Sequence, residues 1–82
     1  MKIRVHVRIV PRQGLLDPQG QAVEHALGAL GFDGMQDVRV GKAIELHIEA
    51  ASAAVARATA ERMCEQLLAN PVTEDFAIEI GA

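Results

Sequence analysis

The sequence predicts an α+β fold: a ferredoxin-like βαββαβ sandwich in which two helices cover one face of a four-stranded antiparallel sheet. Three observations lead to this prediction. Segments near both ends and in the middle of the chain alternate apolar and polar residues, as half-buried strands do. Two segments between them begin with helix-capping residues and end with helix-stopping ones. The resulting order is β-α-β-β-α-β, and its 82 residues make a single domain, 1–82.

The first predicted strand is Lys2–Val10, in which apolar residues alternate with charged or polar residues as far as Ile9. Successive side chains of a strand point to opposite faces of its sheet. The apolar face of this strand comprises Ile3, Val5, Val7 and Ile9. Pro11 has no backbone N–H to donate and helps to end the strand.

The first predicted helix begins at Asp17-Pro18, with Asp at the N-cap and Pro at the first helical position. We expect the Asp17 carboxylate to accept hydrogen bonds from the free N–H groups of this helix. Its apolar stripe comprises Val23, Ala26, Leu27 and Leu30, and Gly31 is a natural stop. Gly20 and Gly28 each weaken the helix by about 1 kcal/mol relative to Ala, so both suggest close packing or close approach by another chain.

Two further strands are predicted between Gln36 and Glu49, joined by a tight hairpin turn at Gly41-Lys42. The inner faces comprise Val38 and Val40 in the first strand and Ile44, Leu46 and Ile48 in the second.

Ser52 caps the second predicted helix, which runs to about Ala69 and is stopped by Asn70-Pro71. The last predicted strand is 76–80, in which Phe76, Ile78 and Ile80 alternate with polar or small residues.

The sheet face away from the helices is predicted to be charged. It carries Lys2, Arg4, His6, Arg8, Arg39, Glu45, His47, Glu49 and Glu79. In the usual strand order, 4-1-3-2, the basic first strand lies between strands that carry Glu, so opposite charges face each other. We expect a solvated, salt-bridged face. Pairing of this face or its edges with another copy is the alternative.

The totals limit the possible functions. The net charge is −3 and the isoelectric point is about 5.5, so the general basic field that holds a phosphate backbone is missing. The single Cys64 rules out an internal disulfide and fits a reducing cytosol. The N-terminus alternates charged and apolar residues, unlike a signal peptide or a membrane span, which predicts a cytoplasmic protein. With no Trp, no Tyr and two Phe, the core is small, which makes stabilisation by partner chains plausible.

No residue pattern points to catalysis. His6 and His47 lie on an exposed sheet face without close metal-ligand spacing, and no glycine-rich phosphate loop is present. Glu61 and Glu65 flank Cys64, which favours a buried, unreactive thiol. The strands lack the aromatic residues that an RNA-recognition domain needs. From the residues alone this is a small α+β domain that assembles, and a metabolite-binding regulatory domain or a small phosphatase stays open.

Three segments carry a resemblance to a known family. They read LLDPQGQAVEHALGALGF, MQDVRVGKAIELHIE and MCEQLLANPVTEDFAIEI. Their combined motifs, D-P-Q-G-x-A-V, Q-D-V-R-x-G-K and C-E-x-L-L-A-N-x-V, resemble the PurS family, the small subunit of phosphoribosylformylglycinamidine synthase. The resemblance covers nearly the whole chain. The Ala-rich second helix and the ending DFAIEI depart from the family pattern.

The resemblance implies a non-catalytic subunit of an ATP-dependent C–N ligase in de novo purine biosynthesis. In such a complex a glutaminase subunit releases ammonia, and a large synthetase subunit binds ATP and Mg and uses the ammonia to form the amidine. The small subunit, a homodimer or tetramer, bridges the two and helps to keep the ammonia route closed to water. No catalytic residue, cofactor, metal, nucleic acid or membrane is expected for this chain. A ferredoxin-like regulatory domain that binds a small metabolite at a dimer interface is the alternative.

The first helix start and the predicted hairpin hold the most family-like residues with the least evident role in the core. The residues expected to form turns or contact partners are Asp17, Gln19, Gly20, Gln36, Asp37, Arg39 and Lys42. The alternative is that Asp17 is a cap, that Gly20 and Gly41 are required by the backbone, and that the others are solvated.

Overall fold

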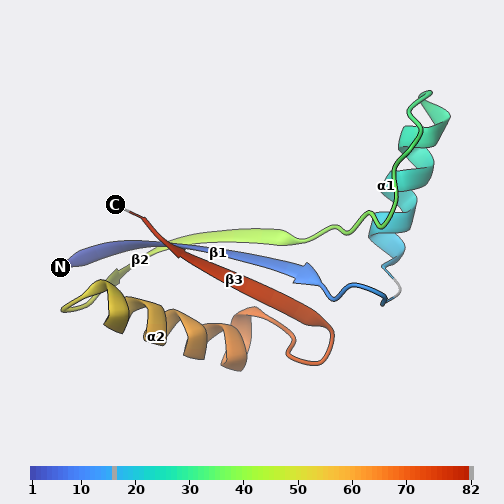
Figure 1. The fold of residues 1–82 in the computed structure, drawn as a ribbon. Coiled ribbons are helices and arrows are strands. Elements are labelled where there is room, and N and C mark those ends of the chain that lie inside the picture. The colour runs from blue at the N-terminus through green and yellow to red at the C-terminus, as the bar shows by residue number, and fades with distance from the viewer. Residues whose placement is uncertain (16, 82) are drawn as a thin grey trace.

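The structure, a computed structural model, describes residues 1–15 and 17–81 and contains three strands and two helices. The strands are β1 (Lys2–Pro11), β2 (Lys42–Glu49) and β3 (Glu74–Ile80). The helices are α1 (Pro18–Ala29) and α2 (Ala53–Met63), and α2 continues as a π-helical turn, η1, at Cys64–Leu68. The sheet is antiparallel in the order β2-β1-β3, with β1 in the centre (Figure 1).

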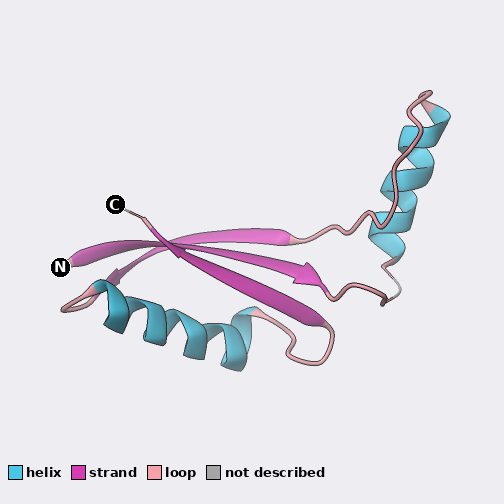
Figure 2. Ribbon diagram, in the orientation of Figure 1, coloured by secondary structure: helices cyan, strands magenta, loops and turns pink. Residues whose placement is uncertain are grey.

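The hydrophobic core lies between β1 and α2, which covers one face of the sheet (Figure 2). The alternation in β1 produces this arrangement, because Ile3, Val5, Val7 and Ile9 share the face that lies against α2. The buried residues are Ile3, Val5, Val7, Ile9, Ile48, Ala56, Ala60, Cys64 and Ala69. Small alanine side chains on α2 allow the helix to approach β1 closely enough to exclude water from its central valines.

The second half of the chain follows its predicted course. The Ser52 hydroxyl accepts a hydrogen bond from the backbone N–H of Val55 at 3.2 Å, which caps α2 as expected. The helical stretch ends at Leu68 and is followed by Asn70 and Pro71. The last strand begins at Glu74, two residues before the predicted start.

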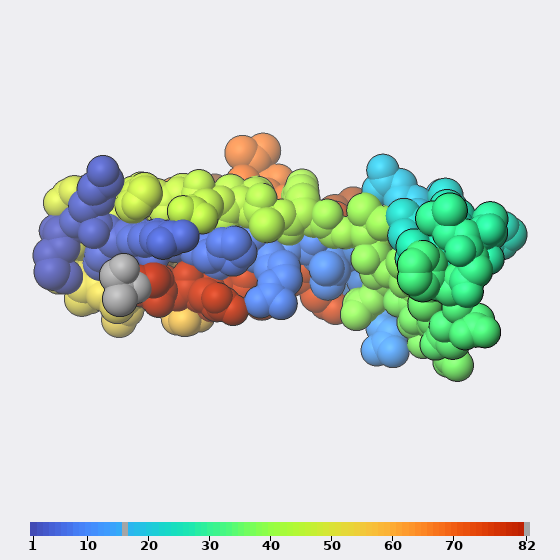
Figure 3. Space-filling view, turned by 90° about the horizontal axis from the view of Figure 1, so that it is seen from above, coloured from blue at the N-terminus to red at the C-terminus, as the bar shows by residue number. Residues whose placement is uncertain are grey.

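The helix α1 stands beyond the end of the sheet and covers neither face (Figure 1). The chain leaves β1, forms α1, and returns alongside it through residues 32–41, here called the return segment. We call residues 17–41 the arm. Figure 3 shows the arm as a separate mass at one end of an elongated molecule, whose principal extents are 50 × 26 × 15 Å. Within the described residues the chain is therefore a sheet-and-helix body with a projecting arm.

Three parts of the predicted fold are wrong for the chain as described. The sheet has three strands where four were expected, because residues 36–40 carry no strand. The Gly41-Lys42 hairpin turn is absent, and the chain runs directly into β2 (Figure 1). Only α2 lies on the sheet. The physical reason lies in the arm, where the backbone of the return segment packs against the start of α1 instead of against β2.

Candidate functional site: the arm and its junction with the sheet

The junction begins where α1 starts. The Asp17 backbone is extended, as an N-cap residue requires, but its side chain does not cap α1. One carboxylate oxygen, Oδ2, instead accepts a hydrogen bond from the backbone N–H of Val40 at 2.8 Å. The expected bonds to the helix itself are replaced by one that ties the helix start to the return segment.

Gly20 makes this close approach possible. It is the buried residue of α1, and a Cβ added to it would lie 2.0 Å from the carbonyl oxygen of Val38. No side chain fits in that space, and the obstructing atom belongs to the backbone. The requirement for glycine is therefore set by contact with the return segment, which agrees with the alternative that Gly20 is a backbone necessity.

The electrostatics at this point favour an ionised Asp17. The hydrogen bond from Val40 lowers the pKa of the Asp17 carboxyl below its ordinary value. The backbone N–H groups of Gly20 and Gln19 act in the same direction, while partial desolvation opposes them. The negative charge is thus stabilised where the arm meets the sheet.

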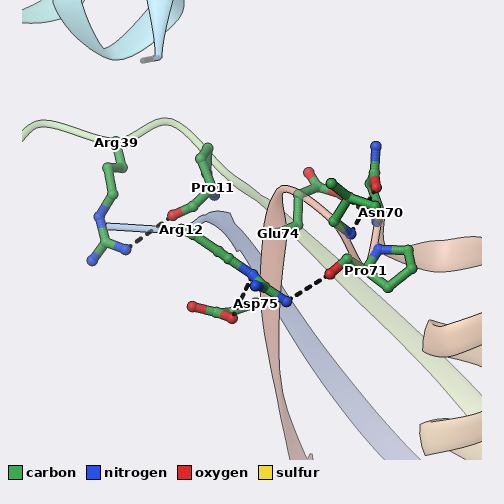
Figure 4. Close-up of polar contacts among 8 residues, drawn as sticks. Pro11, Arg12, Arg39, Asn70, Pro71, Glu74 and Asp75 are labelled. Carbon is green, nitrogen blue, oxygen red and sulfur yellow. Dashed lines mark hydrogen bonds and ion pairs between the residues drawn. The ribbon is translucent and has the colours of Figure 1, made fainter. Parts of the chain in front are cut away.

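Two arginines complete the junction at the end of β1 (Figure 4). Arg39 donates from Nη1 to the carbonyl oxygen of Pro11 at 3.0 Å, which fastens the return segment to the end of β1. Arg12 donates from Nη2 to the carbonyl oxygen of Pro71 at 2.6 Å, and its Nε lies 3.4 Å from Asp75. The end of β1 thus holds both the arm and the turn before β3.

An open cleft of about 490 Å³ lies between the start of α1 and the return segment. Asp17, Glu24, Asp37 and Arg39 are among the residues that line it. Arg39 is already engaged by Pro11, and no nucleophile stands beside a base in this cleft. The arrangement is that of a structural joint, and it holds no organised reaction centre.

Three of the residues singled out from the sequence, Asp17, Gly20 and Arg39, meet at the junction. Gln19, Gln36, Asp37 and Lys42 are exposed. Asp37 has a positive φ of 55° and marks a bend in the return segment, and Lys42 begins β2 opposite Ile9. The predicted role of all seven as turns or partner contacts stays a prediction.

The arm also has an exposed apolar surface, which the sequence pattern did not predict. Leu30 is 74% exposed, Phe32 60% and Val23 40%, although Val23 and Leu30 belong to the predicted apolar stripe. An apolar stripe on a helix indicates that the helix packs against another apolar surface, but it does not identify that surface. A second set of exposed apolar residues lies around the end of α2 and β3 and comprises Met63, Leu67, Val72 and Phe76.

The open face of the sheet is salt-bridged and solvated, as predicted, but Arg39, which was assigned to this face, lies in the arm because residues 36–40 form no strand. Arg4 pairs with Glu45 and Arg8 with Glu79, each at 3.0 Å, and all four side chains are about half exposed or more. His6 lies between the two glutamates in register, 3.9 Å from Glu45. Among residues 1–15 and 17–81, no group of three or more His, Cys, Asp or Glu is placed to hold a metal ion.

The Cys64 thiol is fully buried in the core. Burial raises the pKa of Cys64, and the negative charges of Glu65 and Glu61 raise it further. Both effects disfavour the reactive thiolate, so the interpretation of Cys64 as a packing residue is confirmed. None of the described helices is both long and apolar enough to cross a membrane.

Comparisons with known proteins agree on one family. Residues 4–82 match the family model PurS, described as phosphoribosylformylglycinamidine (FGAM) synthase. The chain is 47% identical to the PurS subunit of this synthase from Synechocystis, over 96% of the chain and 77% of the relative. It is 44% identical to that of Bacillus subtilis, over 96% and 90%. A chain in the solved structure of PurLQS from Thermotoga maritima superimposes with a TM-score of 0.88 at 27% identity, and the match covers 99% of each chain.

Proposed function

Because this chain belongs to the PurS family of phosphoribosylformylglycinamidine synthase, we propose that it acts as the small subunit that joins the other parts of that enzyme. The complex is a glutamine-dependent ligase of purine biosynthesis. In this proposal a glutaminase subunit supplies ammonia and a large subunit, which binds ATP and Mg²⁺, forms the amidine. The small subunit contributes no reacting group and bridges the two.

The observation that carries the proposal is the combination of an apolar projecting arm with the lack of an organised reaction centre among the described residues. Leu30 and Phe32 stay exposed on the arm, and the polar side chains that line the cleft beside it are carboxylates, amides and an engaged arginine. Exposed apolar surface of this kind marks contact with other proteins. A chain built this way works through docking.

The chemistry of ammonia explains why such a subunit is useful. Ammonia released at one site and consumed at another has to be kept from bulk water and from protonation on the way. Correct placement of two active sites also replaces a chance encounter by a directed one. A rigid connecting subunit supplies this placement through its shape. In this proposal the complex acts in the cytoplasm, with the rest of the pathway.

We also propose that copies of the chain assemble as a dimer or tetramer, and that assembly completes the four-stranded ferredoxin-like sheet. β2 is an edge strand with unpaired backbone groups. The sequence of residues 36–40 has the alternation of a strand, but these residues are not paired with β2 in the single chain. If residues 36–40 of another copy paired with β2 as a fourth strand, the free backbone groups of both segments would be hydrogen-bonded.

Reconstitution tests the function directly. Formation of the amidine product is measured with glutamine as nitrogen source, using the purified large and glutaminase subunits with and without this chain. We expect no turnover by the chain alone and a glutamine-dependent rate that rises severalfold when it is added. Ammonium salt supplied to the large subunit bypasses the transfer route. The rate of amidine formation from ammonium salt should therefore depend much less on the chain than the rate from glutamine. An equal glutamine-dependent rate in the absence of the chain would refute the proposal.

The alternative of a metabolite-binding regulatory domain is not favoured by the relatives, which carry the name of the synthase subunit. It predicts that a single amino acid or nucleotide raises the melting temperature of the chain by several degrees. Measuring the melting temperature of the free chain with amino acids and nucleotides therefore separates the two functions, because only the regulatory domain predicts such a rise.

A further inference from the structure

β3 forms one edge of the sheet, and no strand lies on its outer side within the described residues. We propose that Arg57 of α2 keeps this edge closed to any further strand, so that assemblies of the chain grow only from the β2 side. This role rests on the proposed function only in that copies of the chain assemble. It adds which edge of the sheet is excluded from assembly and which side chain excludes it.

The backbone groups of β3 alternate between the side that faces β1 and the outer side. Such alternation is general for antiparallel pairs. Gly81 donates its backbone N–H to the carbonyl oxygen of Arg4 on β1, so every second residue counted back from Gly81 faces β1. The residues between them turn their N–H and C=O groups outward and are Phe76, Ile78 and Ile80. Outward groups of this kind are a template for pairing with another chain.

Arg57 closes the middle of this outer row. Its Nη1 donates to the carbonyl oxygen of Ile78 at 3.1 Å, so the guanidinium reaches from α2 across the edge of β3. At the start of the strand, the N–H of Glu74 is used in the preceding turn, where it donates to the carbonyl oxygen of Asn70 at 2.8 Å. The open stretch between these two places is centred on Phe76. It is shorter than a typical strand of about five or six residues.

The sequence of β3 explains why the edge needs this protection. Phe76 stays 37% exposed, which leaves a large apolar side chain beside the open stretch. Charged side chains usually protect an edge by repelling a second strand. The acidic side chains of β3 are paired within the chain, Glu79 with Arg8 at 3.0 Å and Asp75 with Arg12 at 3.4 Å. Their repulsion is weakened by this pairing, which leaves the contact from Arg57 to close the edge.

Removing the guanidinium tests this role. At the same concentration, Arg57→Ala should reach a mean mass at least twofold above that of the unaltered chain, by light scattering and native mass spectrometry. Arg62→Ala removes the same charge from an exposed position of the same helix and is the matched control. We expect its mass to equal that of the unaltered chain. An Arg57→Ala chain that keeps the mass of the unaltered chain at every concentration would overturn the proposal.

Hydrogen exchange separates pairing at this edge from association elsewhere. The Phe76 amide points outward, so it should exchange rapidly in the unaltered chain and at least tenfold more slowly in the larger particles of Arg57→Ala. The Ala77 amide faces β1 and should be protected in both. Larger particles in which the Phe76 amide still exchanges rapidly would also refute the role of Arg57.

Two further variants keep the test valid if Arg57→Ala does not fold. Arg57→Met retains a long stem over β3 but has no donor, so it should also form larger particles, and Arg62→Met is its control. Arg57→Lys retains a donor and a charge and should keep the mass of the unaltered chain. If Arg57 only fastened α2 to β3, Arg57→Met would melt at a lower temperature and leave the mass unchanged. That result would contradict the proposal.

These experiments use the chain without the other synthase subunits. Equal masses of Arg57→Met and Arg62→Met would remove the role of Arg57 and leave the subunit role in place. Failure of the chain to support glutamine-dependent turnover would remove the subunit role and leave the comparison of masses unaffected.

Discussion

The carboxylate of Asp17 accepts a hydrogen bond from the backbone N–H of Val40, although 23 residues separate them. Through this bond a residue at the N-cap position of α1 stabilises the extended segment that leads into β2. Gly20 allows the approach because it lacks the side chain that would collide with Val38. The direction of the arm is therefore set by a few backbone contacts at its base.

Replacement of Asp17 by Ala should loosen the base of the arm. The variant leaves the Val40 N–H without its acceptor, whereas Asp17→Asn keeps a side-chain oxygen and should retain most of the protection. Hydrogen exchange at the Val40 amide, followed by NMR, measures the effect directly, and the Ala variant should also melt at a lower temperature. Asp33→Ala, at an exposed position of the arm, is the control. Unchanged exchange at Val40 in the Ala variant would contradict this role for Asp17.

The contribution of Asp17 should depend on pH. Its pKa in the folded chain is held below the ordinary value of 3.8, first by the bond from Val40. Folding therefore favours the ionised form, so the stabilisation is complete well above pH 3.8 and is lost as the pH falls through the lower folded pKa. The difference in unfolding free energy between the unaltered chain and Asp17→Asn, measured by urea denaturation, should be constant from about pH 5 to 7 and shrink toward pH 3. A difference that grows toward low pH would have the wrong sign.

The sequence was sufficient to predict those strands and helix starts that depend on a local residue pattern. Alternation over Lys2–Val10 predicted β1 because Ile3, Val5, Val7 and Ile9, on one face of that strand, all enter the core. Ser52 marked the start of α2, and Asp17-Pro18 the start of α1, because the free N–H groups of a first turn restrict which residues precede it. The salt-bridged open face followed from the same alternation.

The placement of α1 could not be derived in this way. An apolar stripe and an alternating strand indicate that a segment needs partners, but the pattern is the same whether these lie in its own chain or in another. Glycine at residue 41 is compatible with a tight turn and equally with close passage over Ile9, and the structure shows the second. The partner of Asp17 was missed because any backbone N–H satisfies a carboxylate, and no local signal points to Val40.

Two glycines of α1 should respond oppositely to substitution by alanine. At Gly20 the new Cβ would meet the Val38 carbonyl, so a backbone shift is required and we expect a loss of about 1–3 kcal/mol in unfolding free energy. At Gly28 nothing lies within 4 Å of the added atom, so Gly28→Ala should stabilise the helix by up to about 1 kcal/mol. Urea denaturation of both variants measures the difference. Equal effects at the two positions would show that contact with the return segment does not constrain Gly20.

Cys64 should be protected from thiol reagents while the chain is folded. The side chain is fully buried, and burial together with Glu65 and Glu61 raises its pKa above the ordinary value of 9.0. Because the thiolate is the reactive form, labelling by a disulfide reagent at neutral pH should be at least ~100-fold slower in the native chain than in urea. A cysteine introduced at the exposed Val72 is the control and should react at once, which leaves the slow phase to Cys64. Rapid labelling of native Cys64 would mean that the contact between α2 and β1 opens far more readily than its packing implies.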